Sequence, residues 1–122
     1  MEIIRKRREL REKVIEEAKK WVSKLPFKCT AVLIGSYARG DFNLWSDVDI
    51  LLIADVEGRP PERLEKIDYP PGYEVIVIKP QEFHIGVEKK NPLVIEAIRE
   101  GVVLRDDYRI IEEAKKKEAT LP

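Results

Sequence analysis

The hydrophobic positions of the chain follow two patterns, one typical of an amphipathic helix and one typical of buried strands. Over residues 2–25, apolar side chains recur at helical spacing between charged ones, which predicts a long amphipathic helix. Pro26 follows this segment and ends the predicted helix, because proline has no backbone N–H to donate. Short apolar runs predict three buried strands, at residues 30–34, 47–54 and 73–78.

The segments between and after these strands are more polar. Residues 35–46 form a compact connection, and residues 55–72 form a longer one that contains four prolines. We expect one helical turn inside the longer connection, at residues 62–67. Pro80 and Asn91-Pro92 are typical helix starts. The remaining expected elements are helices over residues 80–89, 91–101 and 108–117, the last of them frayed, and a short edge strand at 102–104.

The order of these elements predicts an α+β fold: a small mixed β-sheet of three core strands and one short edge strand, with helices packed on it. The short link between the first two strands favours an antiparallel pair, whereas the longer connection suits a crossover to the third strand. A length of 122 residues without an internal repeat fits one domain over residues 1–122.

Charge is balanced over the whole chain but not along it. Lys plus Arg and Asp plus Glu number 23 each, so the formal net charge is zero, which argues against a nucleic-acid partner. Residues 1–28 nevertheless carry a net charge of +5, and residues 41–74 carry −6. An acidic centre is suited to a divalent cation, although acidic turns in solvent would give the same count.

Cysteine content and hydropathy bear on the compartment. Cys29 is the only cysteine, so the chain forms no internal disulfide, and its place at the start of an apolar run predicts a buried thiol in a reducing compartment. The sequence has no apolar run of membrane length and no signal-peptide pattern at its start. We therefore expect a soluble, cytoplasmic protein.

The first candidate for chemistry is Gly35-Ser36, directly after a predicted buried strand. Glycine allows the backbone to approach a ligand closely, and backbone N–H groups at the start of a turn bind anions. Arg39 lies one turn further on, where its guanidinium would reach the same phosphate. A glycine-serine pair after a strand is also a common turn, so by itself it does not identify a site.

The second candidate is Asp47-Val48-Asp49 at the start of the next strand. Residues two apart on a strand point to the same face, so the two carboxylates would stand side by side. Adjacent carboxylates repel each other unless a cation lies between them, and oxygen ligands of this kind suit Mg²⁺ or Mn²⁺. The alternative is a solvated acidic entry to the strand.

The two candidates stand in a fixed relation, Gly-Ser, ten residues, then Asp-x-Asp. In the segments Gly-Ser-Tyr-Ala-Arg-Gly-Asp and Ser-Asp-Val-Asp-Ile-Leu-Leu the chain resembles nucleotidyltransferases of the DNA polymerase β type, and more closely their minimal nucleotidyltransferase group. The likeness is specific over residues 35–53 and loose elsewhere. The matching residues are Gly35, Ser36, Arg39, Gly40, Asp47 and Asp49.

The resemblance implies a third acidic residue on the third strand. The candidate is Glu74, where many relatives carry aspartate; its alternative role is that of an outward-facing strand residue. The family implies that Asp47, Asp49 and Glu74 are the catalytic metal ligands, for Mg²⁺ or Mn²⁺. It implies that Gly35, Ser36 and Arg39 bind the phosphates of a nucleoside triphosphate.

The implied reaction transfers a nucleoside monophosphate, AMP above all, from a nucleoside triphosphate such as ATP to an acceptor hydroxyl. Since 122 residues fit one domain, we expect no second substrate domain, and the resemblance points to a protein acceptor or a partner chain. Minimal nucleotidyltransferases pair with HEPN-domain ribonucleases as antitoxin and toxin, so the resemblance implies a HEPN protein as partner and acceptor. A non-catalytic antitoxin that masks the toxin, and an ordinary α+β domain with a chance motif, are the alternatives. The sequence leaves a homo-oligomer open.

Three features near the candidate site have two interpretations each. Phe42 and Trp45 lie in the connection between the two motifs, and would either stack on a base or cover the core. The basic run over residues 5–8 would either contact RNA or form a solvated helix face, which its neighbouring glutamates favour.

Overall fold

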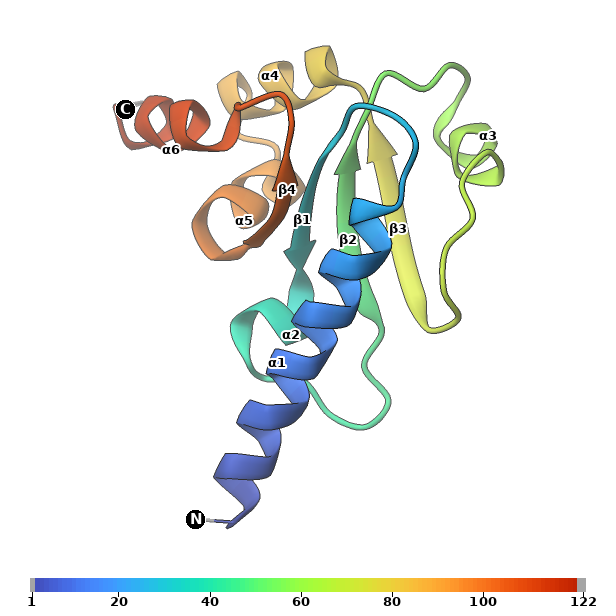
Figure 1. Ribbon diagram of the computed structural model, residues 1–122. Helices are drawn as coiled ribbons and strands as arrows, with labels where there is room; N and C mark the ends of the chain where they lie inside the picture. The colour runs from blue at the N-terminus through green and yellow to red at the C-terminus, as the bar shows by residue number, and fades with distance from the viewer. Residues whose placement is uncertain (1, 121–122) are drawn as a thin grey trace.

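The computed structural model describes residues 2–120, and Figure 1 shows them as helices packed on a four-stranded sheet. The α+β fold expected from the sequence is confirmed. The elements, in chain order, are α1 (Glu2–Ser23), β1 (Thr30–Ile34), α2 (Gly35–Arg39), β2 (Val48–Ile53), α3 (Pro60–Glu65), β3 (Tyr73–Ile78), α4 (Pro80–Glu88), α5 (Pro92–Glu100), β4 (Val102–Asp106) and α6 (Ile111–Thr120).

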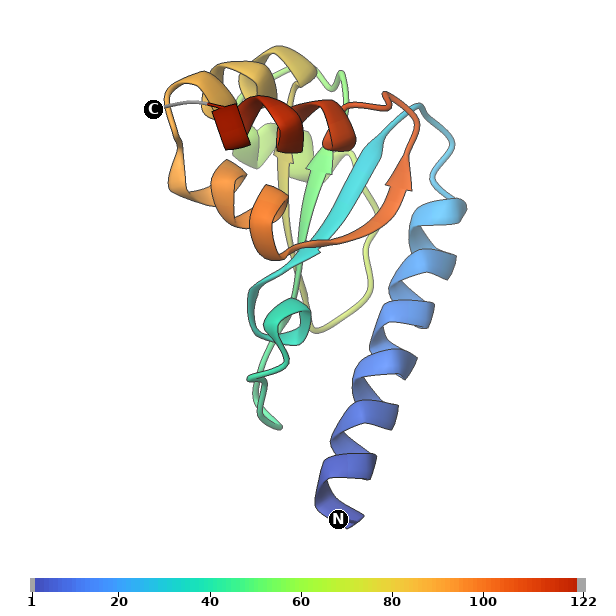
Figure 2. The same cartoon turned by 90° about the vertical axis from the view of Figure 1, so that its left-hand side faces the viewer.

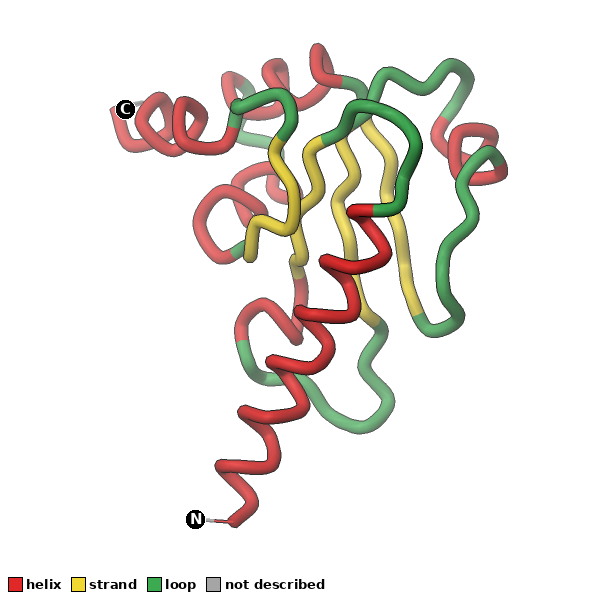
Figure 3. Tube along the Cα trace, viewed as in Figure 1, coloured by secondary structure: helices red, strands yellow, loops and turns green. Residues whose placement is uncertain are grey.

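The sheet has the strand order β3-β2-β1-β4. Strand β1 pairs antiparallel with both β2 and β4, and β2 pairs parallel with β3. The expected antiparallel first pair and the crossover to the third strand are therefore confirmed. Figure 3 shows the connection from β2 to β3 running through α3 along one edge of the sheet. This parallel register brings the amino ends of β2 and β3 to the same end of the sheet.

Helices cover both faces of the two central strands. Helix α1 packs on one face through Val14, Ala18 and Val22. Helices α4, α5 and α6 cover the other face, as Figure 2 shows, where Phe83 and Ile98 are among the buried side chains. All five residues of β1 are buried, because a strand covered on both faces excludes water along its whole length.

Helix α1 is longer than the sheet that it covers. Figures 1 and 2 show its amino-terminal half projecting beyond the sheet, beside the connection between α2 and β2. The large apolar side chains Ile3 and Ile4 on this half are exposed. Between residues 2 and 120 no helix is both long and apolar enough to cross a membrane.

Several boundaries differ from those expected. Helix α1 ends at Ser23 rather than at residue 25, and β2 begins at Val48, so Asp47 precedes the strand. Helix α3 spans residues 60–65 rather than 62–67, because Pro60 occupies its first turn.

The carboxyl-terminal elements are also shifted. Strand β4 continues to Asp106, whose carboxylate accepts hydrogen bonds from the backbone N–H groups of Ile110 and Ile111. This carboxylate caps the start of α6, which spans residues 111–120 rather than 108–117. The fourth strand is thus longer than predicted and the last helix begins later. Cys29 is fully buried, as expected.

Candidate functional site

Strand register brings Gly35, Asp49 and Glu74 together at one end of the sheet. Ile34, the last residue of β1, pairs with Asp49 on β2, so Gly35 begins α2 directly beside this aspartate. Asp49 in turn pairs with Glu74 on the parallel strand β3. The candidate phosphate-binding turn and two of the candidate acids therefore lie on three adjacent strand ends.

Gly35 has a conformation and an environment that exclude other residues. Its φ of 75° lies in the left-handed region, which residues with a β-carbon rarely adopt. A β-carbon at this position would also overlap the Oδ2 atom of Asp49. The glycine thus allows the backbone of the turn to lie directly against the carboxylate.

Asp49 is a carboxylate without adequate solvation. Its Oδ1 atom is buried and has no hydrogen-bond partner among residues 2–120. Burial is the main cause that raises the pKa of Asp49 to about 6, followed by the charge of Glu74, a hydrogen bond shared with Glu74, and the charges of Asp47 and Glu96. A divalent cation would remove this penalty, so the donor set fits a metal ion.

Asp47 has a different environment from Asp49. It is exposed, and it is not among the residues that line the cavity at Asp49 and Glu74. Its charge nevertheless contributes to the raised pKa of Asp49, so the two carboxylates interact. Within residues 2–120, no three His, Cys, Asp or Glu side chains are already gathered as a metal-binding group. A site formed by Asp47, Asp49 and Glu74 therefore requires side-chain adjustment.

Glu96 is a site residue that the sequence did not indicate. Its Oε2 atom accepts hydrogen bonds from the backbone N of Gly35 at 2.9 Å and from Nη1 of Arg39 at 3.2 Å. Arg39 also donates from Nε to Asp41 at 3.2 Å, and this hydrogen bond is the main cause that raises the pKa of Arg39. Glu96 lies on α5, far along the chain from both motifs, so no spacing could have identified it.

Two arginines of α1 hold the turn that carries the glycine-serine motif. Arg11 donates to the carbonyl oxygens of Tyr37 and Ala38, both at 2.7 Å. Arg7 donates to the carbonyls of Gly40 and Phe42 at 3.2 and 2.6 Å. Residues 5–8 are all exposed, as expected of a solvated helix face, and the guanidinium of Arg7 in addition fastens α1 to this turn.

The two aromatic residues of the connection differ in environment. Phe42 is buried, stacks on Tyr37 with ring centroids 4.4 Å apart, and lies under the guanidinium of Arg7. Of the two roles considered for Phe42, stacking on a base or covering the core, the structure shows the second. Trp45 is 89% exposed and Leu44 is 86% exposed, so the tip of this connection presents apolar side chains to solvent.

The glycine-serine turn and the candidate acids Asp49 and Glu74 line a common cavity. Its volume of about 370 Å³ is within the size range of small-molecule sites. Ser36, Arg39, Asp49 and Glu74 all line it, together with Glu96, whose carboxylate accepts hydrogen bonds from Gly35 and Arg39. Its other walls are apolar. The complete lining is Ile34, Gly35, Ser36, Arg39, Asp49, Glu74, Ile76, Leu93 and Glu96.

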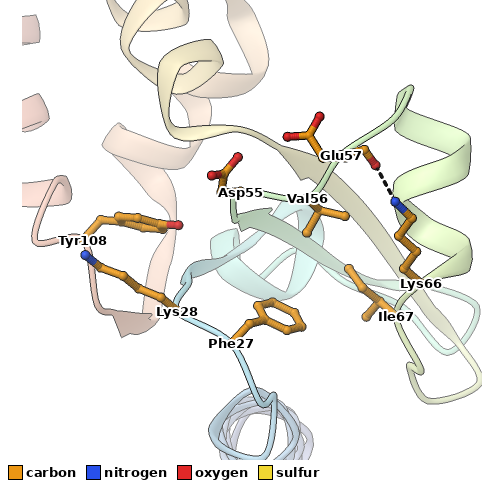
Figure 4. A pocket seen from close by; sticks show the side chains of 8 residues that line it. All are labelled: Phe27, Lys28, Asp55, Val56, Glu57, Lys66, Ile67 and Tyr108. Atoms are coloured by element: carbon orange, nitrogen blue, oxygen red, sulfur yellow. Dashed lines mark hydrogen bonds between the residues drawn. The ribbon is translucent and has the colours of Figure 1, made fainter.

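A second cavity, of about 450 Å³, lies at the opposite end of β2 (Figure 4). Its two lysines are already engaged: Lys66 donates to the carbonyl of Glu57, and Nζ of Lys28 lies 4.8 Å from the ring centroid of Tyr108. No buried side-chain nitrogen or oxygen atom there lacks a partner within residues 2–120. The unpartnered carboxylate oxygen therefore makes the smaller cavity the better candidate for polar ligand chemistry.

Comparison with known proteins identifies the family of the chain. No curated protein matches the chain. The family model described as "Nucleotidyltransferase domain" matches residues 7–119, which include the glycine-serine turn, all three candidate acids and Glu96. The chain belongs to the nucleotidyltransferase domain family and has the nucleotidyltransferase fold.

Proposed function

We propose that this domain transfers AMP from ATP to a hydroxyl group of a protein, with Mg²⁺ or Mn²⁺ as cofactor. Membership of the family supports nucleotidyl transfer as such. One observation supports the location: the buried, unpartnered oxygen of Asp49 lies against Gly35 and beside Glu74. A carboxylate in this state is suited to bind a cation, and the glycine turn next to it is suited to bind phosphate.

The proposed roles follow from the groups that each residue offers. Asp47, Asp49 and Glu74 would hold the metal ions through carboxylate oxygens. When bound, such ions acidify an acceptor hydroxyl and neutralise charge on the leaving pyrophosphate. Gly35 and Arg39 line the same cavity as Asp49, and the backbone N–H of Gly35 and the guanidinium of Arg39 donate hydrogen bonds there to Oε2 of Glu96.

Ser36 and Arg39 would orient the outer phosphates. Both line the cavity with Gly35, and together they offer a hydroxyl, a guanidinium and a backbone amide as donors. These donors would act on charge that moves to the leaving phosphates during transfer. The buried position of Tyr37 and Ala38, with the bonds from Arg11, would keep the turn in place while this charge develops.

A protein acceptor is supported by the surface next to the acids. Leu44 and Trp45 expose apolar side chains two to three residues before Asp47. Ile3 and Leu10 of α1 line the same shallow apolar hollow as Leu44. An exposed apolar surface of this kind is typical of a protein interface. We propose a HEPN-domain protein as the partner that binds here and carries the acceptor hydroxyl.

The test is transfer of label from [α-³²P]ATP to a purified HEPN partner in the presence of Mg²⁺. Label on the partner that disappears in the Asp47→Ala/Asp49→Ala double variant would support the proposal. The same assay with the other three nucleoside triphosphates would measure the base preference. An intact, folded protein that binds neither ATP nor Mg²⁺ would overturn it.

The second candidate function is a non-catalytic antitoxin that masks its partner. The exposed apolar surface favours it, because masking needs an interface and no chemistry. Neutralisation of the ribonuclease by the Asp47→Ala/Asp49→Ala variant would favour masking, whereas loss of neutralisation with retained binding would favour transfer. The variant Trp45→Asp should weaken binding of the partner in both cases.

A further inference from the structure

Glu96 engages two of the groups that the proposed function assigns to phosphate. Its Oε2 atom accepts from the backbone N–H of Gly35 at 2.9 Å and from the guanidinium of Arg39 at 3.2 Å. A single anionic oxygen that accepts one amide and one guanidinium hydrogen bond is the arrangement expected of a phosphate oxygen. The carboxylate of Glu96 thus imitates the ligand in the phosphate subsite.

We propose that Glu96 is an internal competitor for the phosphate subsite, and that a nucleotide phosphate must displace its carboxylate to bind. This inference rests on the proposed function, since it concerns the same cavity. It adds a residue and a mode of regulation: one of the chain's own carboxylates occupies the phosphate subsite, so the affinity of the subsite for a free triphosphate is low until that carboxylate is moved or neutralised.

The charges around Glu96 indicate that its carboxylate competes with a bound phosphate and does not assist phosphate binding. Asp49 and Glu74 line the same cavity, so a triphosphate would enter a space that already holds three carboxylates. The one guanidinium in this lining, that of Arg39, is shared between Glu96 and Asp41. An anionic ligand would therefore gain the full attraction of Arg39 only after Glu96 has left it.

The position of Glu96 allows its side chain to move without the helix. Its side chain is 32% exposed, so it has solvent into which it can turn. The neighbouring residues Ala97 and Ile98 are buried in the core, which fixes the backbone of α5. Displacement therefore costs two hydrogen bonds and a side-chain rotation, but no change in packing.

The test is calorimetric titration with inorganic tripolyphosphate, ATP and adenosine, each in EDTA and in Mg²⁺. Glu96→Gln and Glu96→Ala remove the competing charge. Glu100→Gln is the matched control, because Glu100 lies on the same helix and its charge also acts on Arg39, but the hydrogen bonds from Gly35 and Arg39 go to Glu96. Thermal melts monitor whether each variant is folded.

In EDTA, we expect Glu96→Gln and Glu96→Ala to bind tripolyphosphate about tenfold more tightly than the unmodified protein, since one adjacent like charge is removed. The affinity of the Glu100→Gln control for tripolyphosphate should change by less than about twofold, because the charge of Glu100 acts on Arg39 without a hydrogen bond and is exposed and screened by solvent. Adenosine carries no phosphate, so its affinity should be the same in all variants. The amide resonance of Gly35 should shift both in Glu96→Gln and on addition of tripolyphosphate.

Two results would overturn the inference, and they are distinguishable. If the variants bind tripolyphosphate equally or more weakly while ATP binding and label transfer persist, Glu96 does not compete, and the proposed function stands without it. If tripolyphosphate and ATP bind to none of the folded proteins, with or without Mg²⁺, the proposed function fails, and the inference that rests on it fails too.

Discussion

The carboxylate of Asp49 lies against the α-carbon of Gly35, across the paired ends of β1 and β2. The contact exists because Ile34 pairs with Asp49 and the chain turns into α2 at the next residue. A β-carbon on Gly35 would occupy the volume of the Asp49 Oδ2 atom. The glycine and the aspartate are therefore one structural unit, and the first prediction tests this coupling.

Substitution Gly35→Ala should destabilise the protein by at least about 2 kcal/mol, because it combines left-handed backbone strain with a clash. The matched control is Gly40→Ala: Gly40 also has a positive φ, of 93°, but open space where the β-carbon would lie. Gly40→Ala should lower the free energy of unfolding by only about 1–2 kcal/mol, the cost of backbone strain alone. Chemical denaturation measures the free energy of unfolding of both variants. Adding Asp49→Ala should recover part of the loss in Gly35→Ala and none in Gly40→Ala; equal recovery would contradict the coupling.

Substitution Asp49→Asn should change how stability depends on pH. The pKa of Asp49 is about 6 in the folded protein against 3.8 for an unperturbed aspartate, so the folded state holds its proton more tightly. Stability contributed by this group is therefore present at low pH and is lost as the pH rises from about 4 to about 6. Thermal melts between pH 4 and 8 should show a steeper fall over this window in the unmodified protein than in Asp49→Asn. If the melting temperatures of the two proteins changed with pH in parallel, Asp49 would not be the group that causes this fall in stability.

Addition of Mg²⁺ should raise the melting temperature, and more at pH 8 than at pH 5, because a protonated carboxylate binds a cation poorly. At a Mg²⁺ concentration ten times the dissociation constant, linkage gives about 1.4 kcal/mol of stabilisation. Differential scanning calorimetry measures the shift. Asp49→Asn should abolish it and Glu74→Gln should reduce it. A shift of the same size in Asp49→Asn would place the cation elsewhere.

Substitution Arg11→Ala should loosen the turn that carries Gly35 and Ser36. Arg11 donates two hydrogen bonds of 2.7 Å to the carbonyls of Tyr37 and Ala38, and loss of charged hydrogen bonds to partly buried carbonyls costs about 1–3 kcal/mol. Arg8→Ala on the same helix is the control, because Arg8 is exposed. Hydrogen exchange at residues 36–40 should quicken in the first variant and not in the second; the same exchange rates in both would show that Arg11 does not hold the turn.

Local patterns were sufficient to predict most of the fold. The helical spacing of apolar residues located α1, and short apolar runs located β1, β2 and β3 to within about one residue. Boundaries that depend on distant side chains were less accurate. The start of α6 is one of them, since it is determined by the carboxylate of Asp106 at the end of β4.

The sequence by itself determined the chemical groups of the two local motifs, because the Gly-Ser and Asp-x-Asp pattern is local and its strand periodicity is short-range. Only the tertiary structure decided how these groups meet. Parallel pairing of β2 with β3 put Glu74 beside Asp49, and packing of α5 brought the carboxylate of Glu96 onto Gly35 and Arg39. Such contacts join residues far apart in the chain, and the physical cause is strand register and helix packing, neither of which any single segment encodes.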